Sequence, residues 1–395
     1  MLVSAITASR SSSARAHIVV AGGGFAAIET LLALRALAAD RVRLTVVSPD
    51  PAFVYRPSAT TEAFDGVRSE TYDVAAIADD LGATYHRVRV DAVASQRNWV
   101  RLSSGTRVRY DALVLAIGAR AMASIAGALT FRGQDDVPQF RRLLDELDAG
   151  ELACVVFAVP AGRTWHLPMY ELALLAAARA RARRLKTGIT IVTPEPRPLA
   201  GFRAAGSRLV AALLDEHGVR FVGKSTSKSV SRDGALVLRS GAPIEADRVV
   251  AAPRLRGQRI SGVLAGTSGF VPTDIRGRVQ GLEDVYAAGD MTAFPIKQGG
   301  LAAQQADRIA QTIAASLGLP VRAAPDRFVL RARLLGGPEP VFLRSELDAL
   351  GRPTIATLER THGAVLGSHT KVFARYLTPY LERRRLRLRG TVAAA

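Results

Sequence analysis

A short apolar run over His17–Ala21 opens the regular part of the chain and ends in the glycine triplet Gly22–Gly24. Leucine and alanine then recur at helical spacing over Ala26–Ala39, and a continuous β run follows at Val42–Val47. Short apolar runs are typical of buried strands, and a spacing of three to four residues is typical of a helix. The pattern therefore predicts a strand–helix–strand unit with a tight glycine turn after its first strand.

From Thr84 onward the pattern changes to short alternating runs that predict an inserted β-meander. Its strands are expected at Tyr85–Val90, Asn98–Leu102 and Arg107–Tyr110. The apolar stretch Asp111–Ala119 then predicts a buried strand that runs into Gly118. We interpret Ala121–Gly133 as a crossover linker.

A second α/β unit follows, in which apolar strands again alternate with helical patterns. Strands are expected at Leu152–Val159, Ile189–Thr193, Val219–Val222 and Asp247–Ala252. Helices are expected at Met169–Leu185, at Gly206–His217 and at Val137–Leu147, the last with Asp136 as its cap. This unit has no glycine triplet, because Gly162 stands alone in the loop Pro160–Pro168. Its absence weakens the case for a conventional phosphate cradle in the second unit.

With 395 residues the chain is too long for one ordinary core, and its 48% hydrophobic content is typical of a globular protein. The net charge of +18 has two interpretations: attraction to an anionic partner, or compositional drift toward arginine. We attribute most of it to drift, with the arginine-rich C-terminus as the exception. We expect no nucleic-acid partner.

Cys154 is the only cysteine, and it lies in an apolar run that favours a buried structural thiol. One cysteine forms neither an intramolecular disulfide nor a dithiol redox pair. None of the six histidines has a partner at metal-ligand spacing, so no metal site is expected.

The glycine triplet fits the dinucleotide fingerprint G-x-G-x-x-G/A. Gly22 permits the turn, Gly24 lets the backbone approach a pyrophosphate, and the small Ala27 lets the helix pack against the strand. The helix start offers free N–H groups and a positive dipole end. The acid usually found about 20 residues later is replaced by Ser48, with Asp50 as the alternative ribose ligand.

Two other stretches carry candidate chemistry. Gly289 and Asp290 end a short strand and precede a helix expected at Leu301–Leu317, an arrangement that suits a hydroxyl and an anionic group. The aromatic loop Phe53–Ser58 contains Arg56 and is either a packed connection or a segment that lines a cofactor.

Three motifs follow one another in a fixed order, and they are Val19–Phe25, Tyr110–Gly118 and Val285–Asp290. Over His17–Leu317 the chain therefore resembles the FAD-dependent pyridine nucleotide-disulfide oxidoreductase superfamily. The nearest resemblance is to the type II NADH dehydrogenase and sulfide:quinone oxidoreductase branch, without its redox cysteines. The resemblance implies an α/β fold with two Rossmann-like three-layer domains and a small C-terminal α+β domain. It implies FAD as cofactor and NAD(P)H as the candidate second nucleotide.

The resemblance also implies which positions bind FAD. They are Gly22, Gly24, Phe25, Ala27, Ser48, Asp50, Arg56, Val90, Gly118, Gly289, Asp290, Lys297, Gly299 and Gly300. Asp290 would bond the ribityl chain, the backbone at Val90 would lie near adenine, and Lys297 would face the N1/C2 edge of the flavin. Lys297 and Glu171 are the expected catalytic residues. Glu171 resembles a family glutamate near the nicotinamide, and a plain acid near a helix N-terminus is the alternative.

The implied function is electron transfer from NAD(P)H through the flavin to a quinone or similar small-molecule acceptor. The alternatives are a flavoenzyme with a non-nicotinamide donor and a flavin-binding module with little turnover. Trp165 and His166 stand where the sulfide:quinone branch has a redox cysteine, so sulfide:quinone and disulfide reductase activities are disfavoured. His166 is a weaker acid–base candidate.

The expected domain organisation assigns an N-terminal flexible tail to residues 1–16. The other segments are an FAD-binding domain at 17–131 and 251–320, an NAD(P)-binding-like domain at 132–250, and a C-terminal domain at 321–395. Lys371–Leu377 and Tyr380 are expected at helical spacing, interrupted by Pro379 and followed by Arg383, Arg384, Arg385, Arg387 and Arg389. This helix is interpreted as docked on its own domain, with peripheral contact to an anionic membrane as the alternative. We expect a cytoplasmic location or one on the inner membrane face, and a homodimer is left open.

Overall fold

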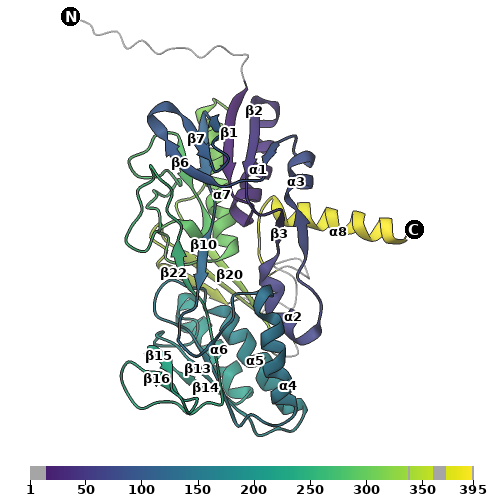
Figure 1. Cartoon of the computed structure of the whole chain (residues 1–395), viewed down its shortest axis with the longest axis vertical. Coiled ribbons are helices and arrows are strands. Elements are labelled where there is room, and N and C mark those ends of the chain that lie inside the picture. Colours follow the sequence, from purple (N-terminus) through teal and green to yellow (C-terminus); the bar gives the residue numbers. More distant parts are fainter. Residues whose placement is uncertain (1–14, 337–338, 359–370, 394–395) are drawn as a thin grey trace, which may run out of the picture.

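The computed structural model describes residues 15–336, 339–358 and 371–393 (Figure 1). The expected N-terminal tail lies almost entirely outside these residues. The first sheet has five parallel strands in the order β19-β9-β1-β2-β5. Their bounds are Val285–Ala287 for β19, Ala112–Leu115 for β9, Ala16–Ala21 for β1, Val42–Val47 for β2 and Thr84–His86 for β5. With α1 at Phe25–Ala38, the predicted strand–helix–strand unit is present.

Both faces of this sheet are covered, which explains its uninterrupted apolar runs. Ile18 and Val20 of β1 pack with α1 and with α7 (Gly299–Ser316), whereas Val19 and Ala21 pack on the opposite face with the meander. The meander is antiparallel and consists of β6 (Val90–Ala94), β7 (Trp99–Leu102) and β8 (Arg107–Arg109). The single strand expected at Tyr85–Val90 was wrong, because its two ends belong to β5 and β6.

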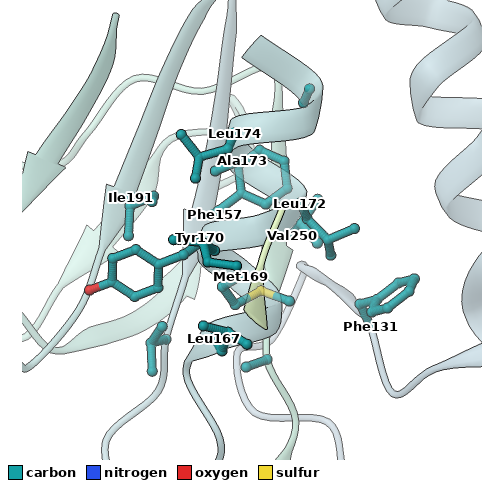
Figure 2. Close-up of a cluster of buried hydrophobic side chains, with 14 of the residues drawn as sticks. Phe131, Phe157, Leu167, Met169, Tyr170, Leu172, Ala173, Leu174, Ile191 and Val250 are labelled. Atoms are coloured by element: carbon teal, nitrogen blue, oxygen red, sulfur yellow. The ribbon is translucent and has the colours of Figure 1, made fainter. Parts of the chain in front are cut away.

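The second sheet also has five parallel strands, in the order β11-β17-β12-β13-β14. They are β11 (Leu129–Thr130), β17 (Arg248–Ala251), β12 (Cys154–Ala158), β13 (Gly188–Val192) and β14 (Val219–Val222). The helices of this unit are α4 (Val137–Asp148), α5 (Leu167–Ala182) and α6 (Arg203–Glu216). Figure 2 shows how Met169, Tyr170 and Leu174 of α5 lie beside Phe157 of β12 and Ile191 of β13, in one buried cluster.

The linker expected at Ala121–Gly133 was wrong, since the segment contains strands. β10 (Ala119–Met122) pairs antiparallel with β18 (Arg254–Gly257), and β11 joins the second sheet beside β17. Both partners lie more than 100 residues later in the chain. Local hydrophobic patterns therefore could not predict these strand pairings.

The C-terminal part contributes an antiparallel sheet, whose buried side chains pack with those of the second α/β unit, and a helix, whose buried side chains pack with those of the first. The strands are β20 (Phe328–Leu334), β21 (Val341–Leu347) and β22 (Pro353–Leu358), and the helix is α8 (Leu377–Ala393). Together with the two parallel sheets this confirms the predicted fold class. The remaining elements are β3 (Ala52–Val54), α2 (Ala59–Asp65), β4 (Thr71–Asp73), α3 (Val74–Asp80), β15 (Ser227–Val230) and β16 (Leu236–Leu238).

Two local expectations were wrong. The helix expected from Lys371 begins only at Leu377, so Pro379 lies in its first turn, where proline is tolerated. Asp136 precedes α4 but makes no capping bond, because its carboxylate accepts from the Arg132 backbone and pairs with the Arg132 guanidinium.

The expectation that the C-terminal helix docks on its own domain was wrong, because α8 is docked on the first α/β unit. The Tyr380 hydroxyl donates to Asp80 over 2.6 Å, and Arg384 forms an ion pair with the same carboxylate. Arg385 pairs with Glu70. Two of the five arginines thus bind acids of this unit, while the side chains of Arg387 and Arg389 lie outside the described residues.

A buried pair of acids ties α8 to the packed helices α1 and α7. Glu29 of α1 is fully buried, and its carboxylate accepts from the backbone N–H groups of Tyr376 and Leu377. Asp307 of α7 lies beside it. Burial raises the pKa of both carboxyls, that of Asp307 to about 8, with the nearby Glu29 charge as the second cause. The pair therefore retains a proton at neutral pH.

This retained proton predicts a pH-dependent stability. The folded state binds a proton that the unfolded state releases above the ordinary pKa of 3.8, so the free energy of unfolding falls as pH rises toward about 8. The decline approaches about 1.4 kcal/mol per pH unit for one proton. Urea unfolding between about pH 5 and pH 8 should show this decline for the unaltered chain and a flatter profile for Asp307→Asn.

The exposed Asp79→Asn variant is the matched control, and its profile should follow that of the unaltered chain. An equally steep decline in Asp307→Asn would contradict the assignment.

Candidate functional site

The turn after β1 requires glycine for two reasons. Gly22 has a φ of 130°, and a Cβ on it would lie 2.2 Å from the carbonyl oxygen of Ala116, just beyond β9. Its N–H donates to the carbonyl of Val47 at the end of β2 over 2.8 Å. Gly22 is therefore enclosed between the carboxyl ends of two neighbouring strands.

The start of α1 faces open space. Gly24 is its N-cap, and neither a capping side chain nor a first-turn acid is present. A Cβ on Gly24 would meet nothing within 4 Å among the described residues. Free N–H groups and a positive dipole end next to open space form an anion site.

The glycine turn also determines where Ser48 and Asp50 lie. A Cβ on Gly23 would lie 2.7 Å from the Ser48 hydroxyl, which is buried directly beneath the turn and donates to the Asp50 carbonyl over 3.3 Å. Asp50 itself is exposed. The structure therefore brings Ser48 against the turn and leaves Asp50 at the surface.

The starts of α1 and α7 converge. A Cβ on Gly289 would lie 3.3 Å from Ala26 of α1 and 3.4 Å from Ala302 of α7. A Cβ on Gly299 would lie 3.4 Å from the Phe25 ring. Two helix N-termini thus point into one region of the first α/β unit.

The region between these helix starts is extended by aromatic side chains. Phe25 packs edge-on against Phe53 and Tyr55, with ring centroids 5.0 and 5.6 Å apart. The Tyr55 hydroxyl accepts from the backbone N–H groups of Lys371 and Val372, each over 3.0 Å. A segment just before α8 is thereby held beside the turn.

Lys297 is a buried cation with few polar neighbours. Its side chain is 3% exposed, its ammonium donates to the carbonyl of Thr292, and the nitrogen lies 4.2 Å above the Phe270 ring. Burial lowers the pKa of Lys297 to about 7; the Asp290 charge opposes this shift and the Arg163 charge adds to it.

Asp290 lies within Coulombic range of two of the predicted cations. Burial raises the pKa of its carboxyl, while the charges of Lys297 and Arg56 lower it. Within the described part of the chain no hydrogen bond or ion pair reaches this carboxylate. The structure thus brings together Asp290, Lys297 and the sequence-predicted Arg56, and leaves the carboxylate available to a hydroxyl.

Glu171, near the start of α5, joins three parts of the chain. One carboxylate oxygen accepts from the Thr60 hydroxyl over 2.6 Å and pairs with the Lys371 ammonium over 2.8 Å, and the other accepts from the Leu335 N–H. Its side chain is 2% exposed. These contacts support a positioning role, and the expected catalytic role of Glu171 stays a prediction.

The second α/β unit also has a glycine-containing loop followed by an uncapped helix start, but the polar groups beside them differ. Gly162 has a φ of 117° with open space around it, and α5 begins without a capping side chain. At the end of β13, Glu195 accepts from the His166 ring over 2.9 Å, from the Tyr170 hydroxyl and from the Ala200 N–H. This acid is satisfied from within the chain.

The remaining predicted positions differ in their surroundings. Gly118 has a φ of 70° and open space at its Cβ, and Val90 begins β6 on the meander side of the sheet. A Cβ on Gly300 would lie 3.3 Å from the carbonyl of Phe373. Ala27 lies in the first turn of α1 and is fully buried.

Sequence reasoning missed Arg163, Phe270, Glu195 and Lys371. Arg163 lies 4.9 Å from the Phe270 ring, on which Lys297 also rests, and one of its guanidinium nitrogens is buried without a partner among the described residues. The position of Glu195, just after a predicted strand, was the one available signal. The other three are brought in by long-range packing.

These residues fit a bound FAD. The open α1 start suits a pyrophosphate, the unpaired Asp290 suits a ribityl hydroxyl, and the cations Lys297 and Arg163 suit the oxygen-bearing edge of a flavin. The orphaned Arg163 nitrogen is the observation that favours an occupant, because buried donors are nearly always paired.

A model of the family described as "Pyridine nucleotide-disulphide oxidoreductase" matches residues 16–316. The sulfide-quinone reductase of Aquifex aeolicus is 28% identical over 55% of this chain and 53% of that protein. The ferredoxin–NAD(+) reductase component of the anthranilate 1,2-dioxygenase system of Burkholderia cepacia is 30% identical over 59% of this chain and 57% of that protein. This chain thus spans little more than half the length of these two relatives.

Among solved structures, the sulfide:quinone oxidoreductase from Aquifex aeolicus superimposes with a TM-score of 0.77, at 21% identity. The superposition covers 94% of this chain and 91% of that chain. At this identity the likeness concerns the fold. None of the helices in the described part of the chain has the length and apolar character needed to span a bilayer.

Substitution of Gly22 and of Gly24 should have different effects on stability and on flavin content. Gly22→Ala places a Cβ against Ala116 at an unfavourable φ and should lower the free energy of unfolding by about 1–3 kcal/mol or more. Gly24→Ala meets open space, so stability should change by less than about 1 kcal/mol. Flavin content should nevertheless fall, because the methyl group occupies the pyrophosphate approach.

Urea unfolding of flavin-free protein and the flavin content of purified protein measure the two effects separately. Equal flavin content in Gly24→Ala and the unaltered chain would contradict the assignment of this turn to the pyrophosphate.

Proposed function

The chain belongs to the pyridine nucleotide-disulphide oxidoreductase family, and we propose that it is an FAD-dependent enzyme that passes electrons from NAD(P)H to a quinone or similar acceptor. The predicted family is confirmed by the match over residues 16–316. The single observation that carries the proposal is the convergence of the α1 and α7 starts on Asp290 and Lys297.

FAD, when bound, would supply the two-electron carrier that the amino acids lack. The chain's own residues bind and tune it. The α1 start binds the pyrophosphate, Asp290 accepts from the ribityl chain, and Lys297 contributes a positive charge that favours the reduced, more negative cofactor.

The nicotinamide donor is supported by the second parallel sheet and by the uncapped start of α5, which follows β12. The lone Gly162 and the internally satisfied Glu195 argue for weaker ribose recognition than a full fingerprint provides. A non-nicotinamide donor is therefore the second candidate, and a flavin-binding module with little turnover is the third.

The electron acceptor is proposed to bind beside Phe373. Its ring is 41% exposed, the Arg331 guanidinium lies 4.9 Å from it, and its carbonyl borders Gly300 at the α7 start. An exposed aromatic beside a cation suits a planar, electron-poor acceptor. The Burkholderia cepacia relative is named as a ferredoxin–NAD(+) reductase component, and the net charge of +18 would suit an acidic carrier protein as the alternative acceptor.

Thiol chemistry is outside the proposal, because Cys154 is the only cysteine. It is half-buried at the first position of β12 rather than fully buried as expected. Membrane contact through α8 and a homodimer stay predictions.

Anaerobic addition of NADH or NADPH to the FAD-loaded protein should bleach the flavin absorbance, and a short-chain quinone should restore it. Cys154→Ser should be reduced at the same rate within about twofold, since no thiol takes part. Absence of bleaching with either nucleotide would overturn the nicotinamide donor. A large loss of rate in Cys154→Ser would overturn the thiol-free route.

Titration of Lys297 should make the affinity for FAD depend on pH. Its ammonium is charged below a pKa of about 7 and neutral above it, so the affinity of flavin-free protein for FAD should be constant below pH 7 and fall above it. The decline can reach at most tenfold per pH unit for one proton. In Lys297→Met the affinity for FAD should be lower than in the unaltered chain, and it should not fall further above pH 7.

Titrations of FAD at about pH 6 and pH 8 measure the effect, with the exposed Lys224→Met as control. If the FAD affinity of Lys297→Met also began to fall near pH 7, the pH dependence would belong to a group other than Lys297.

A further inference from the structure

A cavity of about 610 Å³ opens beside α7, away from the helix start that faces the candidate flavin site. Asp307, Arg308 and Gln311 line it from one face of α7, because residues three and four apart share a helix face. Asp307 and Gln311 are eight and twelve residues beyond Gly299, which is roughly 12–18 Å along the helix. The volume is within the usual range for small-molecule sites, about 300–1,000 Å³.

The wall of the cavity is dominated by arginine. Five arginines line it, against two acids, Asp307 and Glu346. The arginines are Arg308, Arg322, Arg327, Arg344 and Arg375. Glu346 is already occupied, because it pairs with Arg327 and Arg344. The acids therefore neutralise only part of this charge.

The fixed part of the wall is built around Arg308. Its side chain is 6% exposed, it donates to the carbonyls of Pro325 and Arg327, and it lies 4.1 Å from the Phe328 ring. These bonds hold the segment before β20 against α7 without offering a carboxylate to the guanidinium. Arg308 thus contributes a buried positive charge to the cavity wall.

Two further arginines in the wall are unpaired. Within the described ranges, the guanidinium groups of Arg322 and Arg375 form no ion pair, and that of Arg375 stacks over the Tyr376 ring, 5.3 Å away. The Arg375 charge acts on Asp307, but the raised pKa of Asp307 keeps this acid largely protonated at neutral pH. Buried acceptor oxygens of Asp307 and Gln311 also lack partners in this wall.

We infer that this cavity is a binding site for a small phosphate-bearing molecule with at least two negative charges. Guanidinium groups bind phosphate through paired N–H donors, and three of them lack a carboxylate partner here. The concave shape favours a soluble molecule over a membrane surface or a nucleic-acid backbone. The site is separate from the proposed flavin and acceptor sites and does not depend on the proposed function.

Inorganic pyrophosphate is the probe for this inference. Calorimetric titration of the FAD-loaded full chain at low salt should show one saturable site. Arg322→Gln and Arg375→Gln should each weaken it by about tenfold, as expected for loss of a charge-assisted contact. Arg208→Gln on α6, an exposed arginine of the second unit, is the matched control and should bind as the unaltered chain does.

The measurement uses oxidised protein without an electron donor, so its result is independent of catalytic activity. The visible flavin spectrum of each variant checks that it is folded. No saturable binding to the unaltered chain, or equal binding by all variants, would overturn the inference. A second outcome would also overturn the inference. In it, the unaltered chain does not bind pyrophosphate but co-sediments with anionic phospholipid vesicles, and both cavity variants lose this co-sedimentation. The arginines would then bind a membrane surface.

Discussion

The close approach of β1 and β9 at their carboxyl ends is the constraint on which the candidate site depends. Only glycine fits at position 22, because any side chain would collide with the Ala116 carbonyl. This contact sets where α1 begins. Gly289 sets where α7 begins relative to α1, since a Cβ there would press on Ala26 and Ala302. The positive ends of both helices therefore meet over one crevice, and their combined potential explains why an anionic cofactor suits it.

Buried charges then attach the C-terminal segment to this arrangement. Lys371 pairs with Glu171 of the second unit, and Glu29 of the first unit binds the backbone just before α8. Each charge would be costly if left alone in the interior, so each pair strongly disfavours separation of the parts that it joins. The residues between these two attachments include Phe373, whose position beside the α7 start is thereby fixed from both sides.

The local part of this picture was predictable from sequence and the long-range part was not. The turn at Gly22 and the strand Val42–Val47 follow from patterns within a few residues, whereas the roles of Asp290 and Lys297 come from the family resemblance and stay predictions. The pairing of β10 with β18 and the meeting of Arg163 with Phe270 join residues about 100 or more positions apart. Hydrophobic periodicity does not reveal such contacts, because it reflects only the local structure of each segment.

The two parallel sheets differ in what remains unpaired at their carboxyl ends. In the first, the helix start and Asp290 have no protein partner within the described residues, so both are available to a ligand. In the second, Glu195 is already bonded to His166 and Tyr170, so a ribose would have to replace existing bonds and gain little. The start of α5 and the space around Gly162 remain open, so this end of the second sheet offers N–H groups to a phosphate more readily than a free acid to a ribose hydroxyl.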